Sequence, residues 1–117
     1  MEIGEVSGRF AAALAAGDLD ALMRLYAPDA VLIPGPDRPP LVGHEAIRGE
    51  LSTYLGSPST IRTIDRSTHV NGSLALITAT WEITADDGTT QRGTAAEVLR
   101  RESDGRWVYV IDNPYGA

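Results

Sequence analysis

The chain has 117 residues, of which 43% are apolar and 22% charged, with a formal net charge of −6, and this length fits one domain over residues 1–117 with one core. All ten basic residues are arginine and they form no cluster, which argues against nucleic acid or an anionic membrane as partner. The absence of cysteine excludes disulfides and thiolate chemistry, and the lack of a signal-like N-terminus or a long apolar run predicts a cytoplasmic protein with no membrane partner.

The first 28 residues are predicted to form two helices. Gly17 is suited to end the first, and Asp18 is suited to cap the second. The second helix is predicted to carry Tyr26 and to end at Pro28. The first helix has apolar side chains at steps of three and four, which form one stripe: Ile3, Val6, Phe10 and Leu14.

A short strand, a proline-rich loop and a third helix are expected next. Residues 30–33 read as a strand, and residues 34–40 must form a loop because four prolines cannot join a β-ladder. The third helix follows Gly43 and is expected to end near residues 56–58, where glycine and proline occur. The loop is expected to rim a pocket mouth, and Asp37 could reach inward as a base only if the loop folds in.

The second half is predicted to be four antiparallel strands, near 60–70, 73–86, 89–103 and 106–113. Three dipeptides favoured in two-residue hairpin turns separate them: Asn71-Gly72, Asp87-Gly88 and Asp104-Gly105. The complete pattern predicts an α+β fold with helices on one face of an antiparallel sheet.

Two-residue turns would fix the sheet register and so decide which side chains share a face. Glu97 then lies opposite Thr78 on one neighbouring strand and opposite Asp112 on the other. The same face would hold Asp65 and His69, whereas Trp81 would lie on the opposite face. A bulge would break this inference, and a register shifted by one residue would make Trp81 the pocket wall and Glu97 a surface residue.

The chain resembles the nuclear transport factor 2-like superfamily, which includes SnoaL-like proteins and ketosteroid isomerases. The resemblance covers nearly the whole chain and is carried by residues 17–22, 25–31, 39–43 and the closing hairpin at 104–107. It implies a cystatin-like cone in which three N-terminal helices pack on a curved antiparallel sheet around a central pocket. It also implies that the outer sheet face forms a homodimer, since an exposed apolar stripe there would need cover.

Compared with the steroid isomerases, the resemblance places Pro34 where the general base is expected and Phe10 where an oxyanion-binding tyrosine is expected. Tyr26 matches a supporting tyrosine, Leu51 replaces another, and Glu97 falls at the oxyanion aspartate position. Neither proline nor phenylalanine can move a proton, so steroid isomerisation by that mechanism is not expected.

Glu97 and Asp112 are the candidate catalytic residues, because two close carboxylates share a proton and one becomes an acid near neutral pH. The alternative is that one of them pairs with an arginine or lies near solvent. His69 could act as a proton shuttle if it points inward, and no metal site is expected from His44 and His69, which lie far apart. The predicted ligand-binding set is Phe10, Leu14, Tyr26, Pro34, Tyr54, His69 and Thr78.

Three functions are compatible with the sequence. The first is a cofactor-independent isomerase or cyclase that acts on a small hydrophobic, polyketide- or steroid-like molecule through a pocket carboxylate. The second is a binding protein that holds such a molecule without reaction. The third is an association module that only dimerises. An epoxide-hydrolase-like role needs an arginine between two acids, and the predicted register puts Arg62, Arg66, Arg92 and Arg100 on the other face.

Overall fold

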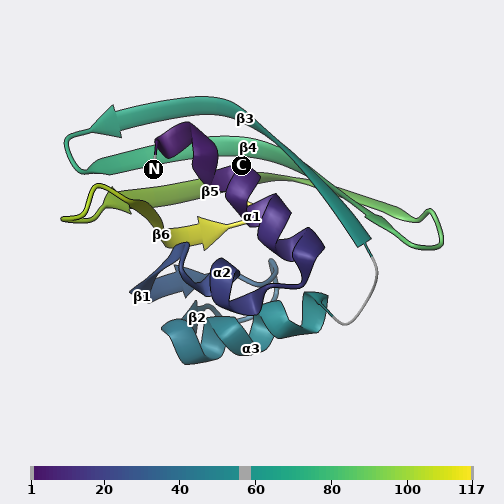
Figure 1. Cartoon of the computed structure of the whole chain (residues 1–117). Coiled ribbons are helices and arrows are strands. Elements are labelled where there is room, and N and C mark those ends of the chain that lie inside the picture. The colour runs from purple at the N-terminus through teal and green to yellow at the C-terminus, as the bar shows by residue number, and fades with distance from the viewer. Residues whose placement is uncertain (1, 56–58, 117) are drawn as a thin grey trace.

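A computed structural model of the chain, which describes residues 2–55 and 59–116, shows an α+β fold in which helices cover one face of a curved, unclosed sheet (Figure 1). Six strands form the sheet in the order β2-β1-β6-β5-β4-β3. The elements in chain order are η1 (Ile3–Glu5), α1 (Val6–Ala16), α2 (Leu19–Met23), β1 (Tyr26–Leu32), β2 (Leu41–Val42), α3 (His44–Tyr54), β3 (Ser59–Asn71), β4 (Leu74–Ala85), β5 (Thr90–Arg101) and β6 (Trp107–Asn113).

The helices begin and end largely where their capping residues predict. Gly17 closes α1 in the left-handed conformation, with φ of 67°, and the Asp18 side chain caps α2 by accepting a hydrogen bond from the Ala21 amide. The helix predicted after Gly43 is α3, and its expected end at residues 56–58 lies outside the described residues. None of the described helices is long and apolar enough to cross a membrane.

The prediction that the second helix includes Tyr26 was wrong. α2 ends at Met23, and Tyr26 is the first residue of β1. The reason is tertiary: Tyr26 pairs with Tyr109 of β6, and the Tyr109 amide donates to the Leu25 carbonyl oxygen at 2.8 Å. Pairing with a buried strand outweighs the local helix preference of residues 24–26.

The sheet is mixed rather than fully antiparallel. β1 runs parallel to β6, whereas the other pairings, including β1 with β2, are antiparallel. The four strands predicted in the second half are confirmed within a few residues, and residues 34–40 form the predicted loop between β1 and β2.

The assumed two-residue turns were wrong at the last two hairpins. Ala85 pairs with Thr89 and Glu102 with Arg106 through backbone hydrogen bonds, which leaves three-residue loops that end at Gly88 and Gly105. Both glycines have φ of 87°, the left-handed geometry of the bulge that closes such loops. One extra loop residue shifts the register by one, which turns every partner residue to the other face.

The inner face of β4 therefore differs from the prediction. Ala75, Ile77, Ala79 and Trp81 are buried, while Leu74 and Leu76 are exposed on the outer face. Ala79 pairs with Ala95, and both are buried on the inner side of the sheet. The helices and this face enclose the core, whose most deeply buried side chains are Val6, Leu22, Ile47, Leu51, Leu99 and Val108.

Candidate functional site

A cavity of about 340 Å³ lies between α1, the end of α3, the inner sheet face and the C-terminal residues. Its walls are mainly aliphatic and aromatic, with acidic and hydroxyl groups among them. Its volume is near the lower end of the range of small-molecule sites, about 300 to 1,000 Å³. The residues that line it are Ser7, Phe10, Leu14, Thr53, Tyr54, Ile61, Thr63, Ala79, Trp81, Ile83, Ala85, Gln91, Ala95, Glu97, Tyr109, Asp112, Pro114 and Tyr115.

Two carboxyl groups lie side by side on the sheet wall of this cavity. Glu97 of β5 is the register partner of Asp112 of β6, as predicted, and both line the cavity. The pairing survives the longer hairpin loop because β6 has a bulge at Val110, between the Val98–Ile111 and Leu99–Tyr109 pairs. The loop and the bulge each shift the register by one residue, and the two shifts cancel at Asp112.

Burial raises the pKa of both carboxyl groups of this pair. Asp112 is buried, which raises its pKa to about 6, while hydrogen bonds from Tyr26 and Glu97 oppose the rise. Burial is also the main cause that raises the pKa of Glu97 to about 9, and the charges of Asp112 and Asp65 raise it further. At neutral pH the pair therefore holds one proton, carried by Glu97 and donated in a hydrogen bond to Asp112.

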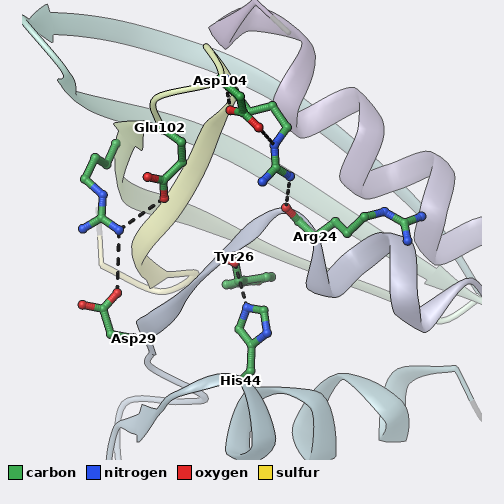
Figure 2. A network of polar contacts seen from close by, with 8 residues as sticks. Arg24, Tyr26, Asp29, His44, Glu102 and Asp104 are labelled. Atoms are coloured by element: carbon green, nitrogen blue, oxygen red, sulfur yellow. Dashed lines mark hydrogen bonds and ion pairs between the residues drawn. The ribbon is translucent and has the colours of Figure 1, made fainter.

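Tyr26 supports Asp112 from below the cavity. Its hydroxyl donates to Asp112 Oδ2 at 2.6 Å, and its ring is buried against Tyr109 at a centroid distance of 5.1 Å. His44 Nε2 of α3 lies 2.8 Å from the Tyr26 carbonyl oxygen (Figure 2). Tyr26 thus positions a catalytic candidate rather than lining the cavity, and His44 binds the backbone of β1.

Arginines from the β5–β6 hairpin contact residues at and just before the start of β1 (Figure 2). Arg106 donates to the Arg24 carbonyl oxygen at 3.1 Å and to Asp104 at 3.0 Å. Arg100 lies 3.8 Å from Asp29 and 3.3 Å from Glu102. These charge pairs lie outside the cavity. They stabilise the β1 segment that carries Tyr26 and do not neutralise Asp112.

A third carboxylate, Asp65 of β3, lies on the inner face near this pair. It is the register partner of Ala79, and a bulge at Arg66 separates it from Ser67, which pairs with Thr78 on the outer face. Its Oδ1 atom is buried without a hydrogen-bond partner among the described residues. Asp65 therefore adds negative charge behind Glu97 without a cation to balance it.

At the cavity mouth a second tyrosine also donates to a carboxylate. The Tyr54 hydroxyl lies 2.9 Å from Glu50 Oε2, and Arg38 donates to both Glu50 oxygens at 3.0 and 2.8 Å. Hydrogen bonding to Arg38 lowers the pKa of Glu50. Arg38 comes from the proline-rich loop, whereas Asp37 beside it is exposed and does not line the cavity, so the loop does not supply a base.

Trp81 forms a wall that the predicted register assigned to the opposite face. Its indole Nε1 donates to the Pro114 carbonyl oxygen at 2.7 Å, and its ring meets Tyr115 edge-on at 5.7 Å. Gly93 is its register partner, and a Cβ atom there would overlap the indole ring. Trp81 and Glu97 were predicted as alternatives for the cavity wall, and both line the cavity. The register shift turns β4 relative to β5, which brings Trp81 inside, while Glu97 on β5 stays inside.

The other predicted ligand residues divide into three groups. Phe10, Leu14 and Tyr54 line the cavity. Pro34 is buried but does not line it. His69 and Thr78 lie on the outer face, where His69 pairs with Leu76, so neither contributes to the cavity, and the β4 register shift is the reason. Among the described residues no group of histidine and acidic side chains is arranged to hold a metal ion.

Three comparisons relate the chain to known proteins. A sequence model of the SnoaL-like domain matches residues 8–110. A comparison with curated protein sequences finds no match. Solved structures match over nearly the whole chain at identities that show the fold alone.

One such structure is an NTF2-like protein of unknown function from Pseudomonas putida KT2440, with a TM-score of 0.85, 19% identity, and coverage of 98% of this chain and 84% of that chain. Another, from Shewanella oneidensis MR-1, is described in the same way and has a TM-score of 0.84, 18% identity and coverage of 97% and 96%. A ketosteroid isomerase-like protein from Erwinia carotovora atroseptica SCRI1043 has a TM-score of 0.73, 19% identity and coverage of 95% and 90%.

Proposed function

Because the chain belongs to the SnoaL-like domain family, within the nuclear transport factor 2-like superfamily, we propose that its cavity binds a small hydrophobic molecule and that Glu97 and Asp112 move a proton on it. One observation carries this proposal: a carboxyl pair, with Asp112 buried and Glu97 half-buried, faces an apolar, aromatic-walled cavity and has no arginine partner among the described residues. Perturbed carboxyl groups in a concave site are the usual mark of acid–base function.

The chemistry follows from the single proton of the pair. Glu97 donates its proton to a carbonyl oxygen of the ligand, and Asp112, released from the Glu97 hydrogen bond, removes a proton from the adjacent carbon. The product is an enol, and the reverse transfers return the keto form or shift the double bond. No cofactor is required, and polyketide- or steroid-like ketones of small size are the proposed substrates.

Hydrogen exchange in D₂O tests this proposal with 1-tetralone, a small bicyclic ketone. The protein is expected to speed deuterium incorporation next to the carbonyl, measured by proton NMR. Glu97→Gln and Asp112→Asn should each reduce the accelerated rate by about 100-fold or more, because general acid–base groups contribute about 10² to 10⁴. Asp37→Asn, an exposed acid outside the cavity, is the control. Full exchange activity in both cavity variants would contradict the proposal.

A binding protein without catalysis is the second candidate, and one observation favours it. Phe10 packs on Tyr109 at a centroid distance of 6.4 Å and presents no hydroxyl to the cavity. The same assay separates the two functions. Saturable binding of 1-tetralone without faster exchange would assign the cavity to binding alone.

The outer sheet face supports a proposed homodimer or accessory role. Its apolar side chains include Ile64 and Leu76, which are 57% and 43% exposed, and Ile111 beside Val98. Exposed apolar stripes of this kind are typical of protein interfaces. Trp81, Ile77 and Tyr109, which the sequence assigned to this face, point to the core and cavity instead. We expect a dimer by light scattering at micromolar concentration and a monomer after Leu76→Asp; a monomeric wild-type chain would contradict the interface.

A further inference from the structure

We infer that the cavity selects a protonated amine on a small bicyclic or aromatic body and rejects organic acids. The inference deepens the proposed function, because it rests on the cavity being a ligand site and adds an ammonium group to the small ketone proposed there. It is based on the charged side chains and the aromatic rings that line the cavity.

The charged side chains that line the cavity are both acidic. Glu97 and Asp112 contribute carboxyl groups, and the other described lining residues include neither arginine nor histidine. The chain has no lysine. Asp65 adds a third carboxylate behind the pair, and its Oδ1 is buried without a partner in the described part of the chain. The base of the cavity is therefore electrostatically negative, and a buried anion would add to an uncompensated charge.

Arginines near the cavity do not relieve this charge. Arg38 at the mouth is held by both oxygens of Glu50, and Arg106 is held by Asp104 and the Arg24 carbonyl oxygen. Arg62 and Arg92 lie on the outer face, where Arg92 pairs with Glu82 at 2.6 Å. The described residues thus place no free positive charge beside the carboxyl pair, and a cationic ligand would supply one.

Aromatic rings complete the environment that a cation prefers. Trp81, Tyr109 and Phe10 form the deeper walls, and Tyr54 and Tyr115 lie toward the mouth. Aromatic faces attract ammonium groups, with tryptophan the strongest, and the attraction increases when the site is desolvated. The aromatic walls also accommodate the apolar body of the ligand, so one molecule satisfies both features of the cavity.

Three probes that share a naphthalene ring test the inference: 2-naphthylmethylamine, 2-naphthalenemethanol and 2-naphthoate. Their dissociation constants are measured by calorimetry at pH 7 on the full chain. We expect the amine to bind most tightly and the carboxylate to bind on the order of 100-fold more weakly, because its charge would be buried beside Asp112. The alcohol should fall between them.

Variants tie the selectivity to the carboxyl pair. Asp112→Asn should reduce the preference for the amine over the carboxylate by about tenfold or more, and Glu97→Gln, which keeps Asp112 in place, should retain most of it. If Asp112→Asn does not fold, Asp65→Asn should lower the preference by a smaller factor. Asp37→Asn makes the same change in net charge at an exposed site and should leave the preference unchanged.

The outcomes separate this inference from the function on which it rests. Equal affinities for the three probes, or tighter binding of 2-naphthoate, would overturn the charge selection while the ligand cavity stands. Failure of all three probes to bind would overturn the ligand-binding function and the inference with it. An amine preference that Asp37→Asn abolishes as fully as Asp112→Asn would also overturn it, since the selection would then come from net charge alone.

Discussion

The molecule has two tyrosine–carboxylate pairs. In each pair the tyrosine hydroxyl donates a hydrogen bond to the carboxyl group, and the two pairs differ in the third residue that contacts this carboxyl group. At the mouth, Tyr54 donates to Glu50 at 2.9 Å and Arg38 completes the group. At the base, Tyr26 donates to Asp112 at 2.6 Å and Glu97 takes the place of the arginine. The pKa of Glu50 is lowered, whereas that of Asp112 is raised to about 6. The third partner and the burial, not the tyrosine, decide whether the carboxyl holds a structural charge or a mobile proton.

The largest expected effect comes from Glu97→Gln, which removes the proton-holding group at the base. The folded pKa of Glu97 is about 9, above its ordinary value of 4.5, so the folded protein retains a proton that the unfolded chain loses. The stability of the native chain should therefore fall as pH rises from about 4.5 to about 9, by up to roughly 1.4 kcal/mol per pH unit. Urea unfolding at pH 5, 7 and 9 measures this slope.

In Glu97→Gln most of this fall of stability with pH should disappear. The fall that remains is the part that Asp112 contributes between its ordinary pKa of 3.8 and about 6. The variant should accordingly be more stable than the native chain at pH 9. If the unfolding free energies of the two proteins change with pH in parallel, Glu97 ionises normally in the fold. The contrast between raised carboxyl pKa values at the base and a lowered one at the mouth would then be lost.

Removing each tyrosine hydroxyl compares the two pairs directly. Tyr26→Phe leaves buried Asp112 without one of its donors and should cost about 1 to 3 kcal/mol of unfolding free energy at pH 7. Tyr54→Phe is the matched control, because Tyr54 is 41% exposed and Glu50 keeps both bonds from Arg38. Its cost should stay under about 1 kcal/mol. Equal costs from chemical denaturation would mean that burial does not distinguish the two sites.

The smallest effect is expected from Glu50→Gln at the mouth. The lowered pKa of Glu50 means that its stabilisation is present above its ordinary pKa of 4.5 and is lost as pH falls through the lowered value. The variant should lose under about 1 kcal/mol at pH 7, and less in high salt, which screens an ion pair whose Arg38 side chain is 54% exposed. This pH trend is opposite to that of Glu97. A salt-independent loss measured by urea unfolding would argue against an ion pair with Arg38.

Local sequence signals explain the parts of the fold that were predicted well. Gly17, Asp18 and Gly43 mark helix ends, and the three turn dipeptides separate the strands, because each acts through its own backbone geometry. The strand pairing at β1 could not be read in this way. Tyr26 looks helical locally, and its strand conformation comes from β6, which lies more than eighty residues later.

The site was only partly predictable because side-chain facing depends on single-residue shifts. Asp87-Gly88 fits a two-residue turn and also the end of a three-residue loop, and the second geometry occurs. That shift brings Trp81 into the cavity and moves Thr78 out. The pairing of Glu97 with Asp112 was predicted correctly only because the Val110 bulge offsets the longer loop, and no residue type there signals a bulge. The small Gly93 opposite Trp81 was the available clue that a large ring needs space.

The protonation state of Glu97 tests most directly whether the base of the cavity holds a proton. Titration of the side-chain carboxyl carbons by ¹³C NMR, with the Glu97 resonance assigned by its loss in Glu97→Gln, measures it without any ligand. We expect Glu97 to be protonated at pH 7 and to titrate near its raised pKa of about 9, while Asp112 is the group that titrates near 6. A Glu97 carboxylate that is fully ionised at pH 7, with a pKa close to 4.5, would contradict it.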